Sequence, residues 1–302
     1  MSLYIETFIR APLDRVWTHT QDPALHQQWD LRFSEILYVP RTSDDAPQRF
    51  HYATRIGFGL SIRGEGESTG TRHRADGSAT SALRFWSAHP LSLITEGSGY
   101  WKYVPESDGV RFFTSYDYRT RFGALGRAVD RLAFRPLMGW ATAWSFDRLR
   151  RWLEDGTPPA WAFRAAAARA VARGGLALVF AYHGLVPKLL RRDADEVAML
   201  RDAGLAAYQI DVAMRVLGVA ECAFAVVLLT QWRARWPVIA TIVAMLVATL
   251  SVAIASPRYL GAAFNPVTLN LLVLVLAVID LLMHGIVPSA TACRRRPSAS
   301  VS

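Results

Sequence analysis

The chain has 302 residues, of which 52% are hydrophobic and 20% charged, and its formal net charge is +9. This length has room for two domains, and the composition is too apolar for two ordinary soluble ones. The positive charge follows no basic stripe interleaved with aromatic residues, so we expect no nucleic-acid partner. The two cysteines, Cys222 in an apolar stretch and Cys293 in a basic tail, predict no disulfide framework.

Residues 1–155 read as one soluble domain. A strand is predicted over residues 3–10, two short helices follow at Pro12 and Pro23, and six further strand-like runs lie within residues 32–122. A long helical segment is predicted over residues 124–153. An antiparallel sheet wrapped around such a helix is an α+β helix-grip.

Alternation along the predicted strands places hydroxyl and aromatic groups on one buried face. A few fixed polar groups in an apolar pocket are typical of small-ligand sites, although the same residues can simply pack in the core. The ligand-cavity candidates are Tyr52, Thr54, Phe112, Thr114, Tyr116 and Tyr118. The histidines of this half show no metal spacing, and no catalytic residue is assigned.

The opening of this half carries a family resemblance. The segment IRAPLDRVWTHTQDPALHQQWD is similar to the first strand, helix pair and Trp of the START-like, polyketide cyclase-like (SRPBCC) superfamily. The resemblance covers residues 3–155 and implies an apolar cavity between sheet and helix. A hydrophobic small molecule or lipid is therefore the expected ligand.

The last 130 residues contain four apolar stretches, each near the roughly 20 residues that cross a bilayer as a helix. They are centred on residues 174–190, 212–230, 237–256 and 267–287. We therefore predict an all-α four-helix transmembrane bundle over residues 170–288, a juxtamembrane linker over 156–169 and a basic disordered tail over 289–302. No signal peptide is apparent, and eight basic residues flank one side of the spans against five on the other. This predicts a multi-pass protein of the cell (inner) membrane with both termini in the cytoplasm.

The membrane half resembles the DoxX-like family. The segments FAYHGLVPKLL, DADEVAML, RVLGVAECAF and FNPVTLNLLV carry this resemblance over residues 170–287. Some relatives are associated with thiosulfate-to-quinone electron transfer, so the resemblance implies a membrane redox component as one alternative. The residues show no CxxC, haem-ligand pair or GxGxxG, and we expect no cofactor.

Polar residues at membrane depth need partners, because an unpaired charge in hydrocarbon costs several kcal/mol. One hypothesis is a proton-linked or ligand-binding site in which Glu221 titrates against Arg215, His183 or Lys188. The other is a set of interhelical hydrogen bonds that fix the bundle. The candidates are His183, Lys188, Arg215, Glu221, Asn265, Asn270, Asp280 and His284.

Three functional classes follow from the sequence. The preferred one is a membrane-anchored binding module that is not an enzyme. The alternatives are the redox component, acting with quinone or a sulfur compound, and a scaffold. A membrane-protein partner or a second copy of the chain remains open.

Overall fold

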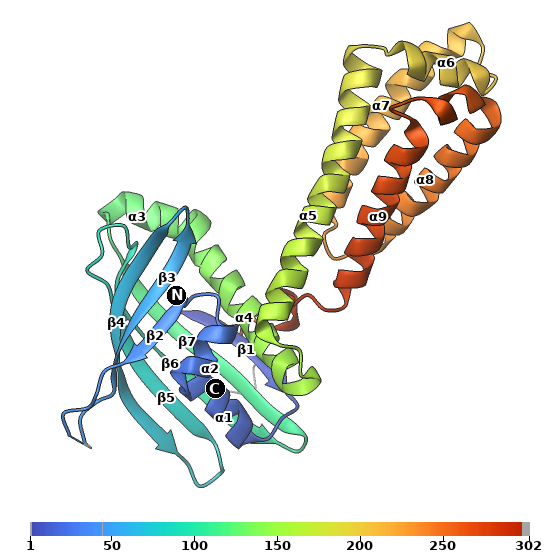
Figure 1. Cartoon of the computed structure of the whole chain (residues 1–302). Helices are drawn as coiled ribbons and strands as arrows, with labels where there is room; N and C mark the ends of the chain where they lie inside the picture. Colours follow the sequence, from blue (N-terminus) through green and yellow to red (C-terminus); the bar gives the residue numbers. More distant parts are fainter. Residues whose placement is uncertain (1, 44, 298–302) are drawn as a thin grey trace. The chain divides into compact units, whose positions relative to one another are not determined.

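The computed structural model describes residues 2–43 and 45–297 and divides into two compact units. Unit 1 comprises Met1–Ala162 with Pro288–Ser302, and unit 2 comprises Phe163–Val287. Figure 1 shows a curved sheet with helices in the first and a set of long helices in the second.

Seven antiparallel strands form the sheet of unit 1. They are β1 (Leu3–Ile9), β2 (Glu35–Tyr38), β3 (Arg49–Gly57), β4 (Leu60–His73), β5 (Ala79–Trp86), β6 (Ile94–Glu106) and β7 (Gly109–Thr120). Their order is β1-β7-β6-β5-β4-β3-β2, so consecutive strands from β2 to β7 pair as neighbours and β1 closes on β7. Register shifts between Arg55 and Gly57, Ser68 and Gly70, and Ile94 and Glu96 bend these strands.

Two short helices follow β1, as predicted. In α1 (Leu13–Gln21) the buried residues Val16 and Thr20 lie one turn apart. The Asp22 side chain accepts hydrogen bonds from the backbone N–H groups of Ala24 and Leu25, which begins α2 (Pro23–Trp29) with Pro at its first turn. The Trp29 ring is buried and donates from Nε1 to the His19 carbonyl at 2.8 Å.

The long helical segment after β7 has three parts. They are α3 (Gly123–Val129), a π-helical turn η1 (Asp130–Phe134) and α4 (Arg135–Asp155), which ends at Gly156 in the left-handed conformation. The α4 helix packs on β1 and α2, and its buried residues include Phe146 and Leu149. Together the sheet and this segment form the helix-grip that the sequence predicts.

Among the described residues four helices are long and apolar enough to cross a membrane, and all of them lie in unit 2 except the first turn of the first one. They are Pro159–Leu190, Ala207–Thr230, Trp236–Ala255 and Pro266–His284. The first consists of α5 (Pro159–His183) and the π-helical η2 (Gly184–Leu190), and the others are α7 (Ala207–Thr230), α8 (Trp236–Ala255) and α9 (Pro266–His284). Short helices α6 (Ala194–Asp202) and η3 (Pro257–Gly261) lie between spans. Because α5 begins at Pro159, most of the expected linker is helical.

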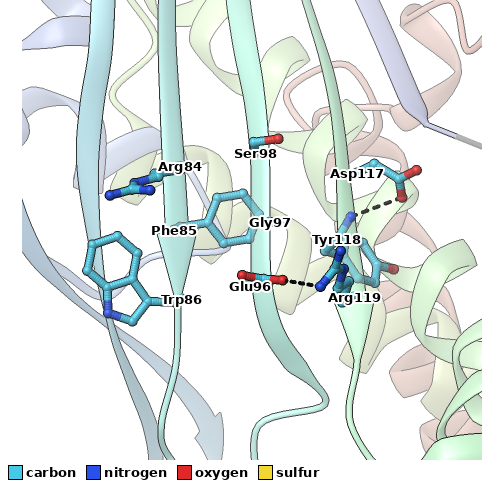
Figure 2. Close-up of a pocket in the computed structure, with 9 residues that line it drawn as sticks. All are labelled: Arg84, Phe85, Trp86, Glu96, Gly97, Ser98, Asp117, Tyr118 and Arg119. Atoms are coloured by element: carbon cyan, nitrogen blue, oxygen red, sulfur yellow. Dashed lines mark hydrogen bonds and ion pairs between the residues drawn. The ribbon is translucent and has the colours of Figure 1, made fainter.

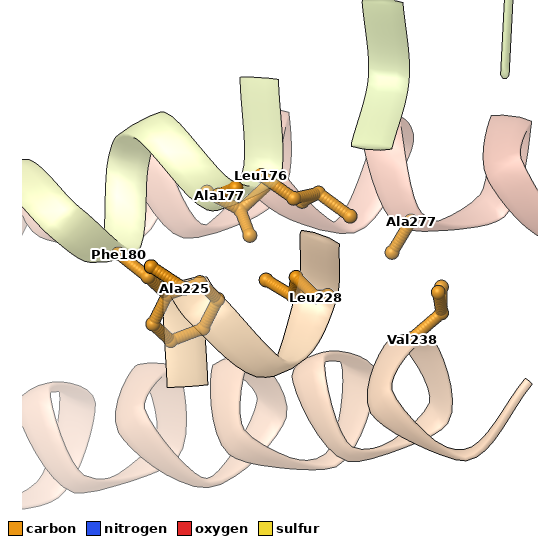
Figure 3. Packing of buried hydrophobic residues seen from close by; sticks show 8 residues of the cluster. Leu176, Ala177, Phe180, Ala225, Leu228, Val238 and Ala277 are labelled. Atoms are coloured by element: carbon orange, nitrogen blue, oxygen red, sulfur yellow. The ribbon is translucent and has the colours of Figure 1, made fainter. Parts of the chain in front are cut away.

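Small and branched residues fill the centre of this bundle. Figure 3 shows Leu176 and Phe180 of α5 beside Ala225 and Leu228 of α7, with Val238 of α8 and Ala277 of α9 in the same cluster. The outward surfaces remain apolar, as expected for helices whose neighbours are lipid chains.

The last segment differs from the sequence prediction. Residues 289–297 were expected to belong to a disordered tail, but Ala290 of η4 (Ala290–Ala292) and Cys293 are buried in unit 1. The backbone N–H groups of Glu6 and Arg294 each donate to the other residue's carbonyl, at 2.9 and 2.8 Å. In the structure this segment thus adds a bridge to the free edge of β1. Residues 298–302 lie outside the described residues.

Candidate functional site

A cavity of about 860 Å³ lies in unit 1 between the concave face of the sheet and the helical segment from α3 to α4. This volume is within the range of small-molecule sites. Apolar and aromatic side chains make up most of its wall, including Phe50 and Leu83 from the sheet and Met138 from α4.

Four of the six predicted cavity residues line this space: Tyr52, Thr54, Thr114 and Tyr116. Phe112 is fully buried and stacks on Phe146, with ring centroids 4.6 Å apart. Tyr118 donates from its hydroxyl to Asp130 Oδ1 at 2.6 Å and lies outside the cavity lining. The structure therefore brings four candidates together and places two in the surrounding packing.

The hydroxyls of the four lining candidates already have protein partners. Tyr116 exchanges a hydrogen bond with Thr142 at 3.0 Å, and Thr114 donates to the Tyr100 carbonyl at 3.1 Å. Tyr52 makes a long 3.4 Å contact with the Trp86 carbonyl, and burial raises its pKa to about 12. These groups chiefly shape the wall.

A charged residue that sequence reasoning missed, Arg32, also lines the cavity and is paired with a carboxylate behind the wall. Asp30, just after α2, is buried and accepts from Arg32 Nε at 2.9 Å and from Arg32 Nη2 at 2.6 Å. His26 Nε2 lies 3.0 Å from Asp30 Oδ2. His26 and Arg32 both face the cavity. The spacing of His26 and Asp30, four residues apart at the end of a helix, was the available signal.

The electrostatics of this triad favour a fixed guanidinium. Burial alone raises the pKa of Asp30, but the Arg32 charge and hydrogen bonds from His26 and Arg32 outweigh it and hold that pKa below its usual range. Burial lowers the pKa of His26 despite the nearby carboxylate. The Arg32 pKa is raised because the opposing Asp30 charge outweighs its burial. Asp30 is thus ionised, His26 is neutral and Arg32 is cationic.

The Arg32 guanidinium retains donors after the ion pair forms. Two of its five N–H groups bind Asp30, and Tyr116 interacts with the same guanidinium, whose carbon lies 5.6 Å from the Tyr116 ring centre. Arg32 therefore gives the largely apolar wall a charge-assisted donor site, while the second arginine of the lining, Arg41, is exposed and donates to Gln48 at 3.0 Å.

A second polar group lines the cavity near α1. Gln21 Nε2 donates to the buried Tyr103 hydroxyl at 2.9 Å, and Thr20 Oγ1 lies 2.7 Å from the same oxygen. Burial raises the pKa of Tyr103 above its usual range, against these two hydrogen bonds. The Gln21 amide and the Tyr103 hydroxyl are both neutral, so the cationic Arg32 is the stronger anchor for a polar ligand group.

The outer face of the sheet carries a shallower hollow of about 630 Å³. Figure 2 shows its lining, with Arg84 and Trp86 of β5, Glu96 of β6, and Asp117 and Arg119 of β7. Arg119 pairs with Glu96 at 2.8 Å, and both side chains are mostly exposed. We interpret this surface as solvated. Among the described residues no group of three His, Cys, Asp or Glu side chains could hold a metal.

In unit 2 the intramembrane candidates separate into two clusters. The first joins α5 to α9, where Arg173 and Asp280 are both fully buried and meet at 2.6 Å. Arg169 contacts Asp280 at 3.3 Å and His284 Nδ1 at 3.0 Å, and donates to the Trp232 carbonyl at 2.6 Å. Sequence reasoning named Asp280 and His284 as candidates but not Arg169 and Arg173, which the structure makes the partners of Asp280.

The second cluster surrounds Lys188 at the end of the first span. Its ammonium lies 3.1 Å from Glu221 of α7 and 3.0 Å from Glu196 of α6. The Lys188 ammonium also lies 3.5 Å from the His183 carbonyl. Sequence reasoning named Lys188 among three partners for Glu221 but missed Glu196.

The other candidates lie apart from these clusters. Asn270 donates to Thr249 Oγ1 at 3.1 Å, and Asn265 caps the start of α9 by accepting from the Thr268 N–H at 2.8 Å. Arg215 is exposed on α7 and has no ion pair within residues 2–43 and 45–297. The eight candidates therefore form two charged clusters, two local hydrogen bonds and one exposed arginine.

Comparison with known proteins agrees with this division. Residues 177–278 match the DoxX-like family. An uncharacterized membrane protein, YndG of Bacillus subtilis (strain 168), is 50% identical over 158 residues, which are 52% of this chain and 59% of YndG. The chain thus matches about three fifths of the length of that relative.

Solved structures similar to the chain cover about half of it. A STAR-related lipid transfer protein from Xanthomonas axonopodis is 19% identical with a TM-score of 0.38, covering 49% of this chain and 82% of its own. A START superfamily protein from Mycobacterium smegmatis is 16% identical with a TM-score of 0.37, and the match covers 52% of this chain and 100% of that protein. The Zhui aromatase/cyclase from Streptomyces is 14% identical with a TM-score of 0.36, covering 52% and 98%.

The chain combines a helix-grip domain with a domain of four apolar helices, long enough to span a membrane, that matches the DoxX-like family over residues 177–278. The strand order and helical segment of unit 1 define the first domain. The DoxX-like match and the four apolar helices define the second.

Proposed function

We propose that unit 1 binds a hydrophobic small molecule or lipid without chemical conversion, and that unit 2 holds this module in the cell membrane. The single observation that supports binding is the cavity of about 860 Å³ with a largely apolar wall and a charged anchor, Arg32, held by the buried Asp30. Apolar surface supplies most of the affinity in such sites, and a few polar groups fix orientation.

The anchor narrows the ligand class. Because Arg32 is cationic and presents N–H donors to the cavity, it suits a ligand whose polar end carries an acceptor oxygen, such as a carboxylate, a ketone or an ester carbonyl. Asp30 already balances the arginine charge, so a neutral carbonyl is accommodated as well as an anion.

Ligand retention by the purified full-length protein tests this function. Mass spectrometry is applied to small molecules released from the detergent-purified wild type, from Leu83→Trp, which fills the cavity, and from Arg84→Trp on the opposite face of the same strand. We expect a retained molecule in the wild type and in Arg84→Trp, and its loss from Leu83→Trp. Equal retention by Leu83→Trp, or an empty wild-type cavity, contradicts the proposal.

The identity of the retained molecule separates the functional classes. A lipid or polyketide-like molecule supports the proposed binding module. A bound quinone supports the redox alternative instead, and an empty protein supports a scaffold.

We further propose that unit 1 faces the cytoplasm. Basic residues are more numerous beside the span ends predicted to be inside, and such residues favour the cytoplasmic side. A fluorescent protein fused to the C-terminus is expected to fold and fluoresce, whereas a periplasmic reporter enzyme at the same position is expected to be inactive. The reverse pair of results contradicts this topology.

A further inference from the structure

The cavity of unit 1 reaches the surface through a rim of exposed apolar side chains. Three segments contribute lining residues that are also about half exposed or more: Ile56 near the end of β3, Leu91 between β5 and β6, and Phe122 and Leu125 around the start of α3. Antiparallel pairing places these three segments at one end of the sheet. We call them the cavity rim, residues 54–64, 87–93 and 121–134.

Two aromatic residues of the rim are held outward by unusual backbone conformations. Phe58, at the tip of the β3–β4 hairpin, is fully exposed and has φ 50°, and Phe122 is 55% exposed and has φ 68°. A positive φ is rare for a bulky residue and tends to occur where function requires it. Only one other non-glycine residue among those described, Arg192, has a positive φ. The backbone at the rim therefore presents apolar rings to the outside.

The rim also carries an excess of positive charge. It contains five arginines and one aspartate, and that aspartate, Asp130, is buried and paired with Arg135. Arg127 and Arg131 are exposed beside Leu125 and Leu132 and have no ion pair within the described ranges. The hairpin loops at the opposite end of the sheet, residues 74–78 and 106–108, contain one arginine and three carboxylates. Positive charge is thus greater at this rim of the cavity than at the two hairpin loops of the opposite end.

From these observations we infer that the cavity rim docks on the surface of an anionic lipid bilayer. Exposed aromatic and leucine side chains partition into the interface, and arginines beside them bind anionic headgroups. A soluble protein partner is less well matched, because the apolar residues surround an opening rather than form a continuous face. Only the purpose of this docking rests on the proposed function: a docked rim lets an apolar ligand pass between bilayer and cavity without crossing water.

Lipid quenching in the full-length protein tests the contact. A fluorescent label is attached at Phe58→Cys or, as a matched control, at Ser107→Cys in the hairpin at the opposite end, with Cys222 and Cys293 replaced by Ser and Ala. Each protein is reconstituted in vesicles of phosphatidylcholine alone or with one third phosphatidylglycerol, with or without spin-labelled phosphatidylcholine as quencher.

We expect the label at position 58, but not at 107, to be quenched and to shift its emission to shorter wavelength, with a larger effect in the anionic vesicles. Arg127→Gln and Arg131→Gln are each expected to lower the ratio of docked to undocked protein about fivefold, as removal of about 1 kcal/mol per arginine predicts. Equal signals at 58 and 107, or quenching that is insensitive to phosphatidylglycerol, overturn the inference. Leu83→Trp, which blocks the cavity, leaves docking unchanged, so failure of ligand binding and failure of docking are distinguishable.

Discussion

At the scale of single residues, Arg32 combines a structural and a binding role. It neutralises the buried carboxylate of Asp30 and presents its remaining donors to the cavity. A lysine at this position keeps the positive charge but loses the planar fork that binds two oxygens at once. The two roles are therefore separable by substitution.

Arg32→Lys is expected to lower affinity for the retained ligand about tenfold, because a hydrogen bond to a charged group contributes roughly 1.5–3 kcal/mol. Arg32→Met is expected to destabilise unit 1 by about 3–5 kcal/mol, since it leaves the buried Asp30 carboxylate with a neutral histidine and a backbone N–H but no positive charge. Ligand retention and the thermal midpoint of the full-length protein measure both effects. Wild-type ligand retention by Arg32→Lys contradicts the binding role.

His26 gives unit 1 a pH dependence. Burial lowers its pKa, so the folded ring stays neutral where the unfolded chain, with an imidazole pKa of about 6.5, takes up a proton. Below that pH the unfolded state binds more protons than the folded state. The contribution of His26 to the stability of unit 1 is therefore complete above about pH 6.5 and is lost as the pH falls toward the folded pKa. We therefore expect the thermal midpoint of the protein to decrease as the pH is lowered from about 7 to about 5.

His26→Phe tests this source of pH dependence. The substitution keeps a ring against Trp29 and Trp101 but removes the titration, so the slope is expected to flatten in that interval. The midpoint at neutral pH is also expected to fall, because Asp30 loses a hydrogen bond. If the thermal midpoint of His26→Phe changes with pH as steeply as that of the wild type, groups other than His26 cause the pH dependence.

Alternation in the sequence predicted which face of the sheet a side chain lies on better than it predicted where on that face the side chain lies. It placed Tyr52, Thr54, Thr114 and Tyr116 on the inner face, where they line the cavity. Alternation fixes only the side of the sheet, so it did not show that Phe112 lies in the packed end beneath Phe146. The triad of Arg32 depends on a loop after α2, whose course no strand or helix period specifies.

At the scale of elements, a buried ion pair connects the first and last spans. Asp280 of α9 accepts from Arg173 and Arg169 of α5, more than 100 residues away in sequence. Hydropathy predicted both helices because it depends on local composition. It did not predict this pairing, because the partners are set by how the helices pack.

Asp280→Leu is expected to destabilise unit 2 more than Arg173→Met, because it leaves two arginines without their carboxylate whereas Arg169 still pairs in the other variant. Breaking a buried pair costs about 3–5 kcal/mol, and the double variant is expected to lose less than the sum of the single ones. Thermal midpoints in detergent measure these changes, with Arg215→Met on the exposed face of α7 as the control. Additive losses contradict direct coupling.

The Lys188 cluster distinguishes the two hypotheses for Glu221. One ammonium is shared by two carboxylates from α6 and α7, so the cluster connects three elements. If its role is structural, Glu221→Gln is expected to retain most of the stability, because the amide oxygen still faces the Lys188 ammonium. Glu221→Ala is expected to lose about 1 kcal/mol more.

If the cluster binds a functional proton, both variants are expected to abolish proton uptake equally. Uptake is measured with a pH-sensitive dye in proteoliposomes, alongside thermal midpoints. Loss of proton uptake in both variants with unchanged stability rejects the structural hypothesis. Preserved stability in the glutamine variant without any proton uptake in the wild type supports it.

At the scale of the whole molecule, the chain leaves unit 1, passes through unit 2 and returns to unit 1. The bridge between Glu6 and Arg294 joins the segments before and after unit 2 within unit 1, which agrees with the proposal that both flanks lie on one side of the bilayer. An even number of crossings gives this arrangement, as four spans do. The returning segment also covers part of the free edge of β1, which otherwise presents unpaired backbone groups.

Deletion of residues 288–302 is therefore expected to destabilise unit 1 although it removes no strand. The backbone of the segment takes part in three hydrogen bonds. Two join it to the Glu6 backbone at Arg294, and one runs from the Ser289 N–H to the Asp147 carboxylate at 2.8 Å. At about 1 kcal/mol each, their loss predicts destabilisation of about 3 kcal/mol. Faster hydrogen exchange of the β1 amides, with little change in unit 2, is the measurement. Deletion of residues 298–302 alone removes none of these contacts and serves as the control, so equal effects of the two deletions contradict the role of the bridge.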